Sequence, residues 1–146
     1  MVDNGVNYSQ ENLKKLLKQF RIPFSDVLVL TNSGEEEPSL PRKQRFKSLI
    51  EKFMVDDDKA KERGKLSLTK EDLLKFKDKT CKILKIRDMM EQHSKHSNMI
   101  VMTLPMASKS NCPCSLYLAW MDLLSHEMPP FCFVRGNQSN VLTFYL

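Results

Sequence analysis

The sequence predicts an α/β fold: a small, mostly parallel sheet covered by helices, with an antiparallel strand at its C-terminal edge. Short apolar runs alternate with longer segments whose apolar residues recur every three or four positions, the pattern of strands joined by crossover helices. The last connection, residues 135–140, is too short for a crossover, so the final strand should reverse direction. With 146 residues, 41% of them hydrophobic and 28% charged, the chain has the size and composition of one domain, residues 1–146.

The N-terminal part predicts one helix and one strand. The helix has an apolar stripe with i, i+3, i+4, i+7 spacing, formed by Leu13, Leu16, Leu17 and Phe20. Pro23 ends this helix. Residues 27–30 are apolar at every position, as expected for a strand buried on both faces of a parallel sheet.

The middle of the chain predicts two helices separated by a mobile linker. The same spacing predicts a helix over residues 42–53, with its stripe formed by Phe46, Leu49, Ile50 and Phe53. Residues 54–68 are interpreted as a mobile linker, because residues 56–65 contain no apolar side chain except alanine.

A long helix is predicted over residues 70–93. Thr69 is its expected N-cap, and Glu71 and Asp72 in the first turn favour the helix dipole. Its predicted inward edge consists of Leu73, Phe76, Thr80, Ile83, Arg87 and Met90, with Leu74 and Leu84 beside it.

The C-terminal block, residues 98–146, predicts strand, helix, strand and strand. Residues 99–104 and 131–134 are apolar runs, and residues 115–124 between them have helical periodicity. These three segments form a βαβ unit with parallel strands. Residues 141–145 are the expected antiparallel edge strand.

No residue pattern indicates catalysis or a cofactor site. The chain lacks the glycine-rich phosphate loops and the Gly-x-Ser-x-Gly motif, and it has only four glycines. Apolar runs fall far short of the roughly 20 residues that cross a membrane, so no direct insertion is expected. Residues 1–7 contain no apolar signal segment, so we expect free thiols in a reducing compartment.

Two weak patterns could suggest metal or acid–base chemistry. Cys112-Pro113-Cys114 is one residue short of Cys-x-x-Cys, and Cys132 or His126 would have to complete a zinc site. Packing of the cysteines as small apolar residues, with Pro113 in the first turn of a helix, is the preferred interpretation. The histidines His93, His96 and His126 lie near predicted helix ends, where the dipole favours imidazolium.

The positive charge is concentrated in the middle of the chain. Residues 42–95 contain seventeen Lys/Arg and ten Asp/Glu, a net charge of +7. The lysines at positions 75, 77, 79, 82 and 85 could bind nucleic acid or anionic lipid, but carboxylates interrupt them, so a solvated helix face is preferred and no nucleic-acid partner is expected. Trp120 and Tyr117 are interpreted as core, with a partner interface as the alternative.

One ligand hypothesis follows from fold geometry alone. Ligands of open α/β sheets bind beyond the carboxyl ends of the strands. Residues 31–34, 105–110 and 135–137 follow the predicted strands and carry small polar groups and two cations. With the helix N-terminus near Pro113, they could hold an anion or a nucleotide phosphate.

The C-terminal motifs, together with two upstream segments, resemble a known family. The segments that carry the resemblance are residues 20–30, 86–94, 98–105, 116–125, 129–137 and 140–145. In this order they resemble the cytosolic C-terminal domain of the cation–chloride cotransporters, the solute carrier 12 family. Val134-Arg135-Gly136-Asn137 followed by Val141-Leu142-Thr143-Phe144-Tyr145 resembles the sodium-dependent branch, the Na–Cl and Na–K–Cl cotransporters.

The resemblance implies a regulatory and assembly domain and no enzyme. It implies a parent transporter in the plasma membrane that moves Na⁺ and Cl⁻, with or without K⁺, and places this domain on the cytosolic side. The implied partners are the transmembrane domain, the upstream C-terminal subdomain and a second copy in a homodimer. No catalytic, cofactor or metal residue is implied in this chain. The alternative is a free-standing soluble α/β module that binds a nucleotide or an anion at the strand ends.

Overall fold

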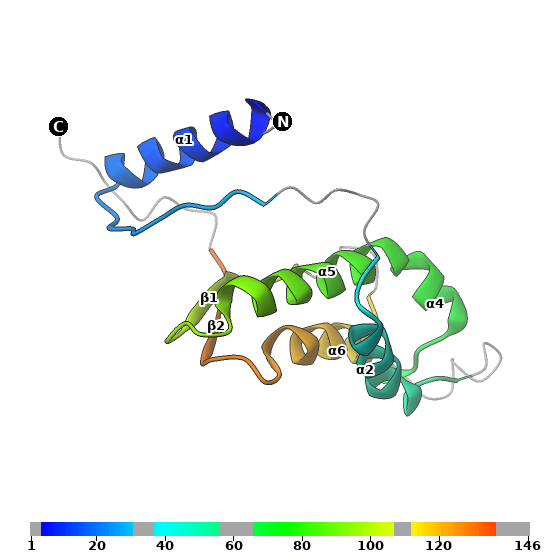
Figure 1. Ribbon diagram of the computed structural model, residues 1–146. Helices are drawn as coiled ribbons and strands as arrows, with labels where there is room; N and C mark the ends of the chain where they lie inside the picture. Colours follow the sequence, from blue (N-terminus) through cyan, green and yellow to red (C-terminus); the bar gives the residue numbers. More distant parts are fainter. Residues whose placement is uncertain (1–3, 31–36, 56–65, 107–111, 137–146) are drawn as a thin grey trace. The chain divides into compact units, whose positions relative to one another are not determined.

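The computed structural model describes residues 4–30, 37–55, 66–106 and 112–136 (Figure 1). The chain divides into two compact units, Met1–Glu36 and Glu37–Leu146, and each is described by itself. The prediction of one domain over residues 1–146 stays a prediction. Among the helices of the described residues, none combines the length and the hydropathy needed to cross a membrane.

The N-terminal unit contains the predicted first helix, α1 (Asn4–Gln19). The chain turns at Arg21, which has a positive φ of 55°, and the Ile22 amide donates to the Leu17 carbonyl at 2.9 Å. The helix therefore ends before Pro23, as predicted. The returning segment is held to α1 by an ion pair between Lys14 and Asp26 at 3.4 Å.

The strand predicted over residues 27–30 does not form. Val27 is buried, but Leu28 and Leu30 are 58% and 45% exposed, so the run is not covered on both faces. The Val27 backbone instead pairs with side chains, since its amide donates to the Asp26 carboxylate and its carbonyl accepts from Gln10. This prediction was wrong because an apolar run indicates burial and does not supply a partner strand.

The elements of the C-terminal unit in chain order are α2 (Leu40–Glu51), α4 (Lys70–Lys75), α5 (Lys77–Ser94), β1 (Ile100–Thr103), α6 (Cys114–Ser125) and β2 (Phe131–Val134). In this unit the helices pack mainly on one another, and a small two-stranded sheet lies beside α5 and α6 (Figure 1). Helix α6 is the most apolar of them and packs against both α2 and α5. The predicted α/β class, with helices on a small parallel sheet, is confirmed.

Strands β1 and β2 are parallel and are joined through α6, as the predicted βαβ unit requires. Ile100 is opposite Phe131, and Thr103 is opposite Val134. The predicted antiparallel strand, residues 141–145, lies outside the described residues, so it stays a prediction.

The predicted linker is anchored at both ends. The Leu68 amide donates to the Phe53 carbonyl at 2.9 Å, and the Val55 amide donates to the Leu68 carbonyl at 3.0 Å. Leu68 itself is fully buried in the core. Residues 56–65 lie outside the described residues, and their predicted mobility stays a prediction.

The long helix predicted over residues 70–93 is in fact two helices. Thr69 caps α4 as predicted, and the cap is reciprocal: the Asp72 amide donates to the Thr69 hydroxyl at 3.1 Å and the Asp72 carboxylate accepts from the Thr69 amide at 3.2 Å. The helix breaks at Phe76, whose φ of −102° and ψ of 12° lie outside the helical range. Only Leu73 of α4 packs on the core, so Leu74, expected beside the inward edge, is 73% exposed.

Trp120 lies at the centre of the core, as predicted. Its side chain is fully buried, and its indole Nε1 donates to the Thr80 hydroxyl at 3.1 Å. Phe76 and Tyr117 pack edge-on against it, with ring centroids at 6.0 and 6.5 Å. The core thus joins the break between α4 and α5 to the middle of α6.

Replacing Trp120 should destabilise the C-terminal unit more than any exposed change on the same helix. We expect Trp120→Ala to lower the free energy of unfolding by about 3–5 kcal/mol, since it removes a large buried ring and leaves a cavity. Trp120→Phe should cost less, because it keeps a ring but removes the donor to Thr80. Leu118→Ala, at a position 58% exposed, is the matched control and should change stability by less than about 0.5 kcal/mol. Urea unfolding measures all three, and equal losses would contradict this assignment of the core.

Candidate interaction site

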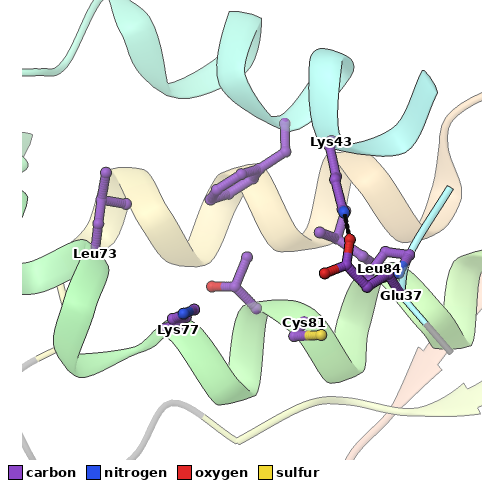
Figure 2. A pocket seen from close by; sticks show the side chains of 9 residues that line it. Glu37, Lys43, Leu73, Lys77, Cys81 and Leu84 are labelled. Atoms are coloured by element: carbon purple, nitrogen blue, oxygen red, sulfur yellow. Dashed lines mark hydrogen bonds and ion pairs between the residues drawn. The ribbon is translucent and has the colours of Figure 1, made fainter. Parts of the chain in front are cut away.

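A cavity of about 290 Å³ opens between α2 and the pair α4–α5 (Figure 2). Its walls are mainly apolar because the inward stripes of two amphipathic helices face each other there. The lining side chains are Glu37, Pro38, Lys43, Phe46, Leu73, Lys77, Thr80, Cys81 and Leu84. Leu73 on α4 lies at one end and Leu84 on α5 at the other, as Figure 2 shows.

The rim of this cavity is positively charged. The Lys43 ammonium contacts the Glu37 carboxylate at 2.5 Å, and Glu37 is otherwise exposed. The hydrogen bond and the charge of Lys43 lower the pKa of Glu37, and the charges of Lys77 and Lys85 lower it further. One ionised carboxylate therefore lies among three ammonium groups at neutral pH.

The floor of the cavity reaches the core. Thr80 lines the cavity and is only 8% exposed, and its hydroxyl accepts the Trp120 indole hydrogen bond. Cys81, one residue further, contributes a half-buried free thiol. An occupant of the cavity would therefore lie one side chain away from Trp120.

Charged side chains fix the start of α2 against α5 next to the cavity. The Asp88 carboxylate accepts from the Ser39 amide at 2.9 Å and from the Ser39 hydroxyl at 2.8 Å. The Arg42 guanidinium pairs with Asp88 at 3.4 Å and also with Glu91. Since Ser39 follows directly after the rim residues 37 and 38, these contacts hold the rim in place.

Arg87 is a buried cation that joins α5 to the end of α6. It is 1% exposed, and its Nη2 donates to the His126 carbonyl at 3.1 Å while its Nη1 lies 3.4 Å from Glu91. Burial lowers the pKa of its guanidinium, and the nearby charge of Arg42 acts in the same direction. Arg45 adds a second tie, from α2 to Asp122 of α6 at 2.8 Å.

The cysteines singled out in the sequence differ in their exposure to solvent. Cys112 is half-buried, whereas Cys114 and Cys132 are exposed, and all are free thiols. Within the described ranges, no group of three potential ligands could hold a metal ion. His93 lies in the last turn of α5 and His126 is the C-cap of α6, the helix-end positions that were predicted.

The strand-end ligand site stays a prediction. Because β1 and β2 are parallel, the segments after Thr103 and Val134 do lie at one edge of the sheet, and Arg135 is exposed there. Residues 31–34, 107–110 and 137, which also belong to the hypothesis, lie outside the described residues.

The lysines of α4 and α5 have more than one role. Lys75, Lys77 and Lys82 are exposed, as expected for a solvated face. Lys79 instead lies over the Trp120 ring, with its ammonium 5.1 Å from the centroid, so that its alkyl stem covers the core.

Sequence reasoning missed the cavity and its rim. Phe46, Leu73 and Thr80 were predicted to face inward, with Leu84 beside that edge. Periodicity does not reveal that two inward faces leave a gap. The sequence patterns gave Glu37 no role. Its spacing of six residues from Lys43 was the available signal, because it allows the chain before α2 to fold back onto the first turns of that helix.

Taken together, the described residues define a small α/β domain with a tightly tied helical layer and an apolar cavity beneath a basic rim. Comparison with known proteins then gives its family. The family model "Solute carrier family 12" matches residues 2–146, and the chain belongs to this family. The resemblance carried by the C-terminal motifs is confirmed.

Three relatives show how far the similarity extends. Solute carrier family 12 member 2 of Homo sapiens is 34% identical over 97% of this chain. Member 3 of Pseudopleuronectes americanus is 32% identical over 93% of the chain, and member 1 of Rattus norvegicus is 29% identical over 97%. The chain spans only 12–14% of the length of these relatives. They are solute carriers and not enzymes, in agreement with the expectation from the sequence.

The Cys112-Pro113-Cys114 segment should show unequal thiol reactivity. Burial raises the pKa of the Cys112 thiol, an effect that the Lys79 charge partly opposes, so less thiolate is present at neutral pH. Each unit by which the pKa of a thiol rises lowers its thiolate fraction at neutral pH about tenfold. We expect brief iodoacetamide treatment to label the exposed Cys114 and Cys132 before Cys112, as read by peptide mass spectrometry. Faster labelling of Cys112 would contradict its packed position.

Arg87 should matter to stability although it is charged. Arg87→Met keeps an unbranched buried side chain but leaves the His126 carbonyl without its donor, and we expect a loss of about 1–3 kcal/mol in the free energy of unfolding. Lys82→Met, an exposed change on the same helix, is the control and should be close to neutral. Urea unfolding at neutral pH compares the two variants. An Arg87→Met variant as stable as the original chain would show that the Arg87 contact with the His126 carbonyl is dispensable.

Proposed function

We propose that this chain is the distal cytosolic regulatory and assembly domain of a sodium-dependent chloride cotransporter. One observation carries the proposal: nearly the whole chain aligns with about an eighth of the length of solute carrier family 12 members 1, 2 and 3. The motifs at residues 134–137 and 141–145 resemble the sodium-dependent branch. Electroneutral movement of Na⁺ and Cl⁻, with or without K⁺, belongs to the parent protein in the plasma membrane.

The surface of the sheet supports a role in assembly. Val101 and Met99 near β1 are 62% and 57% exposed, and Val134 of β2 is 47% exposed. Parallel sheets are normally covered on both faces. An apolar sheet face of this kind fits packing on other parts of the parent, such as the upstream C-terminal subdomain, the transmembrane domain or a second copy in a homodimer.

A chimeric transporter tests this function. The matching segment of human solute carrier family 12 member 2 is replaced by this chain, and chloride uptake is measured with and without external Na⁺, together with the amount of transporter at the cell surface. We expect the chimera to retain Na⁺-dependent chloride uptake. Val101→Asp in the chimera should lower the surface amount several-fold, because a charge would be placed in an assembly interface.

Lys82→Asp in the same chimera is the control, since this exposed lysine lies on α5 and not on the sheet. It should leave surface amount and uptake close to those of the parent chimera. A chimera that reaches the surface normally but moves chloride without dependence on Na⁺ would contradict the proposed branch. An unaffected Val101→Asp chimera would contradict the assembly role of this sheet face.

A further inference from the structure

We propose that the cavity between α2 and α4–α5 docks an acidic peptide segment of a partner protein. A large apolar side chain of that segment enters the cavity, and its neighbouring carboxylates pair with the rim lysines. This inference concerns the cavity of the C-terminal unit and does not depend on the transport activity of the parent.

The size and walls of the cavity fit a single anchoring side chain. At about 290 Å³ the cavity is at or below the lower limit of sites that enclose drug-sized ligands. Phe46 of α2 and Leu73 and Leu84 of the facing helices provide apolar contacts on more than one side. Buried apolar anchors in such pockets supply most of the affinity at protein interfaces.

The charges of the rim fit an acidic partner. Lys43 and Lys77 line the cavity, and Lys85 is close enough to act on the Glu37 carboxylate. Among the described residues, no carboxylate is within ion-pair distance of the Lys77 ammonium, and Lys77 lines the cavity together with Lys43 (Figure 2). Opposite charges on a partner would speed its association and fix its orientation.

The chain itself shows which chemistry this rim accepts. Glu37 places its carboxylate on Lys43, and the next residue, Pro38, is buried at the edge of the cavity. The chain therefore already places an acidic residue, Glu37, followed by an apolar residue, Pro38, on part of the rim. The Asp88 contacts to Ser39 hold this pair in place, so Glu37 competes with an incoming carboxylate for Lys43.

The protein carries its own reporter for occupancy. Trp120 is the only tryptophan, and its indole donates to the hydroxyl of Thr80 on the cavity floor. A side chain that enters the cavity changes the surroundings of Thr80 and, through it, the indole fluorescence. Binding can thus be followed without a label.

The experiment titrates the full chain with the blocked hexapeptide Asp-Glu-Leu-Phe-Glu-Asp and follows tryptophan fluorescence and calorimetry at low and moderate salt. We expect saturable binding with a Kd on the order of 100 μM, and we expect the binding to weaken as the salt concentration rises.

Lys77→Glu should weaken binding about fivefold or more. Lys82→Glu makes the same charge change on the same helix outside the cavity and should alter Kd less than about twofold. Glu37→Gln should strengthen binding, because it removes the internal competitor.

Four results would overturn the proposal. One is no saturable binding at millimolar peptide. A second is equal weakening by the Lys77 and Lys82 variants, which would mean general charge attraction. A third is equal affinity for a peptide in which serine replaces both leucine and phenylalanine, which would show that the cavity is not entered. The last is self-association of the chain that Lys77→Glu abolishes, which would assign the cavity to a second copy.

Discussion

The hydrogen bond from the Trp120 indole to Thr80 sets the arrangement of the C-terminal unit. A buried indole N–H needs an acceptor, and leaving it unpaired would cost about 1–3 kcal/mol. Thr80, near the start of α5, supplies the acceptor. The edge of α5 that carries Thr80, Ile83 and Arg87 must therefore face α6. One polar contact in an apolar core thus determines which face of α5 is buried.

The buried face of α5 also carries Arg87, at the other end of the contact between α5 and α6. An isolated charge would be costly to bury there. Its guanidinium is tolerated because it donates to the His126 carbonyl at the end of α6, a carbonyl without a partner inside the helix, and lies near Glu91. Arg42 and Arg45 then attach α2 to both neighbours. The three helices are held by an apolar centre and by guanidinium contacts at the side, which together fix the distance between α2 and α5.

Most of this arrangement was predictable from the sequence, at the positions where helix-capping preference and apolar spacing both point to the observed structure. The Thr69 N-cap, the inward edge of α5 and the parallel strands around α6 follow from spacing and side-chain type. The segment at residues 27–30 failed because four apolar residues in a row also suit an extended segment whose backbone pairs with side chains. The break at Phe76 could not be read from the sequence, because no glycine or proline marks it and the apolar periodicity continues through it.

The helix break at Phe76 lies next to one end of the cavity. The Phe76 ring packs edge-on against Trp120, and α4 turns away from the axis of α5 at this residue. Leu73, one turn earlier, then closes one end of the space beneath α2 while Leu84 closes the other (Figure 2). The cavity thus lies beside a core packed around one tryptophan, and Lys43 of α2 and Lys77 of α5 give it a basic rim. The cavity depends on how two predicted helices pack against each other, and the sequence of either helix alone does not predict it.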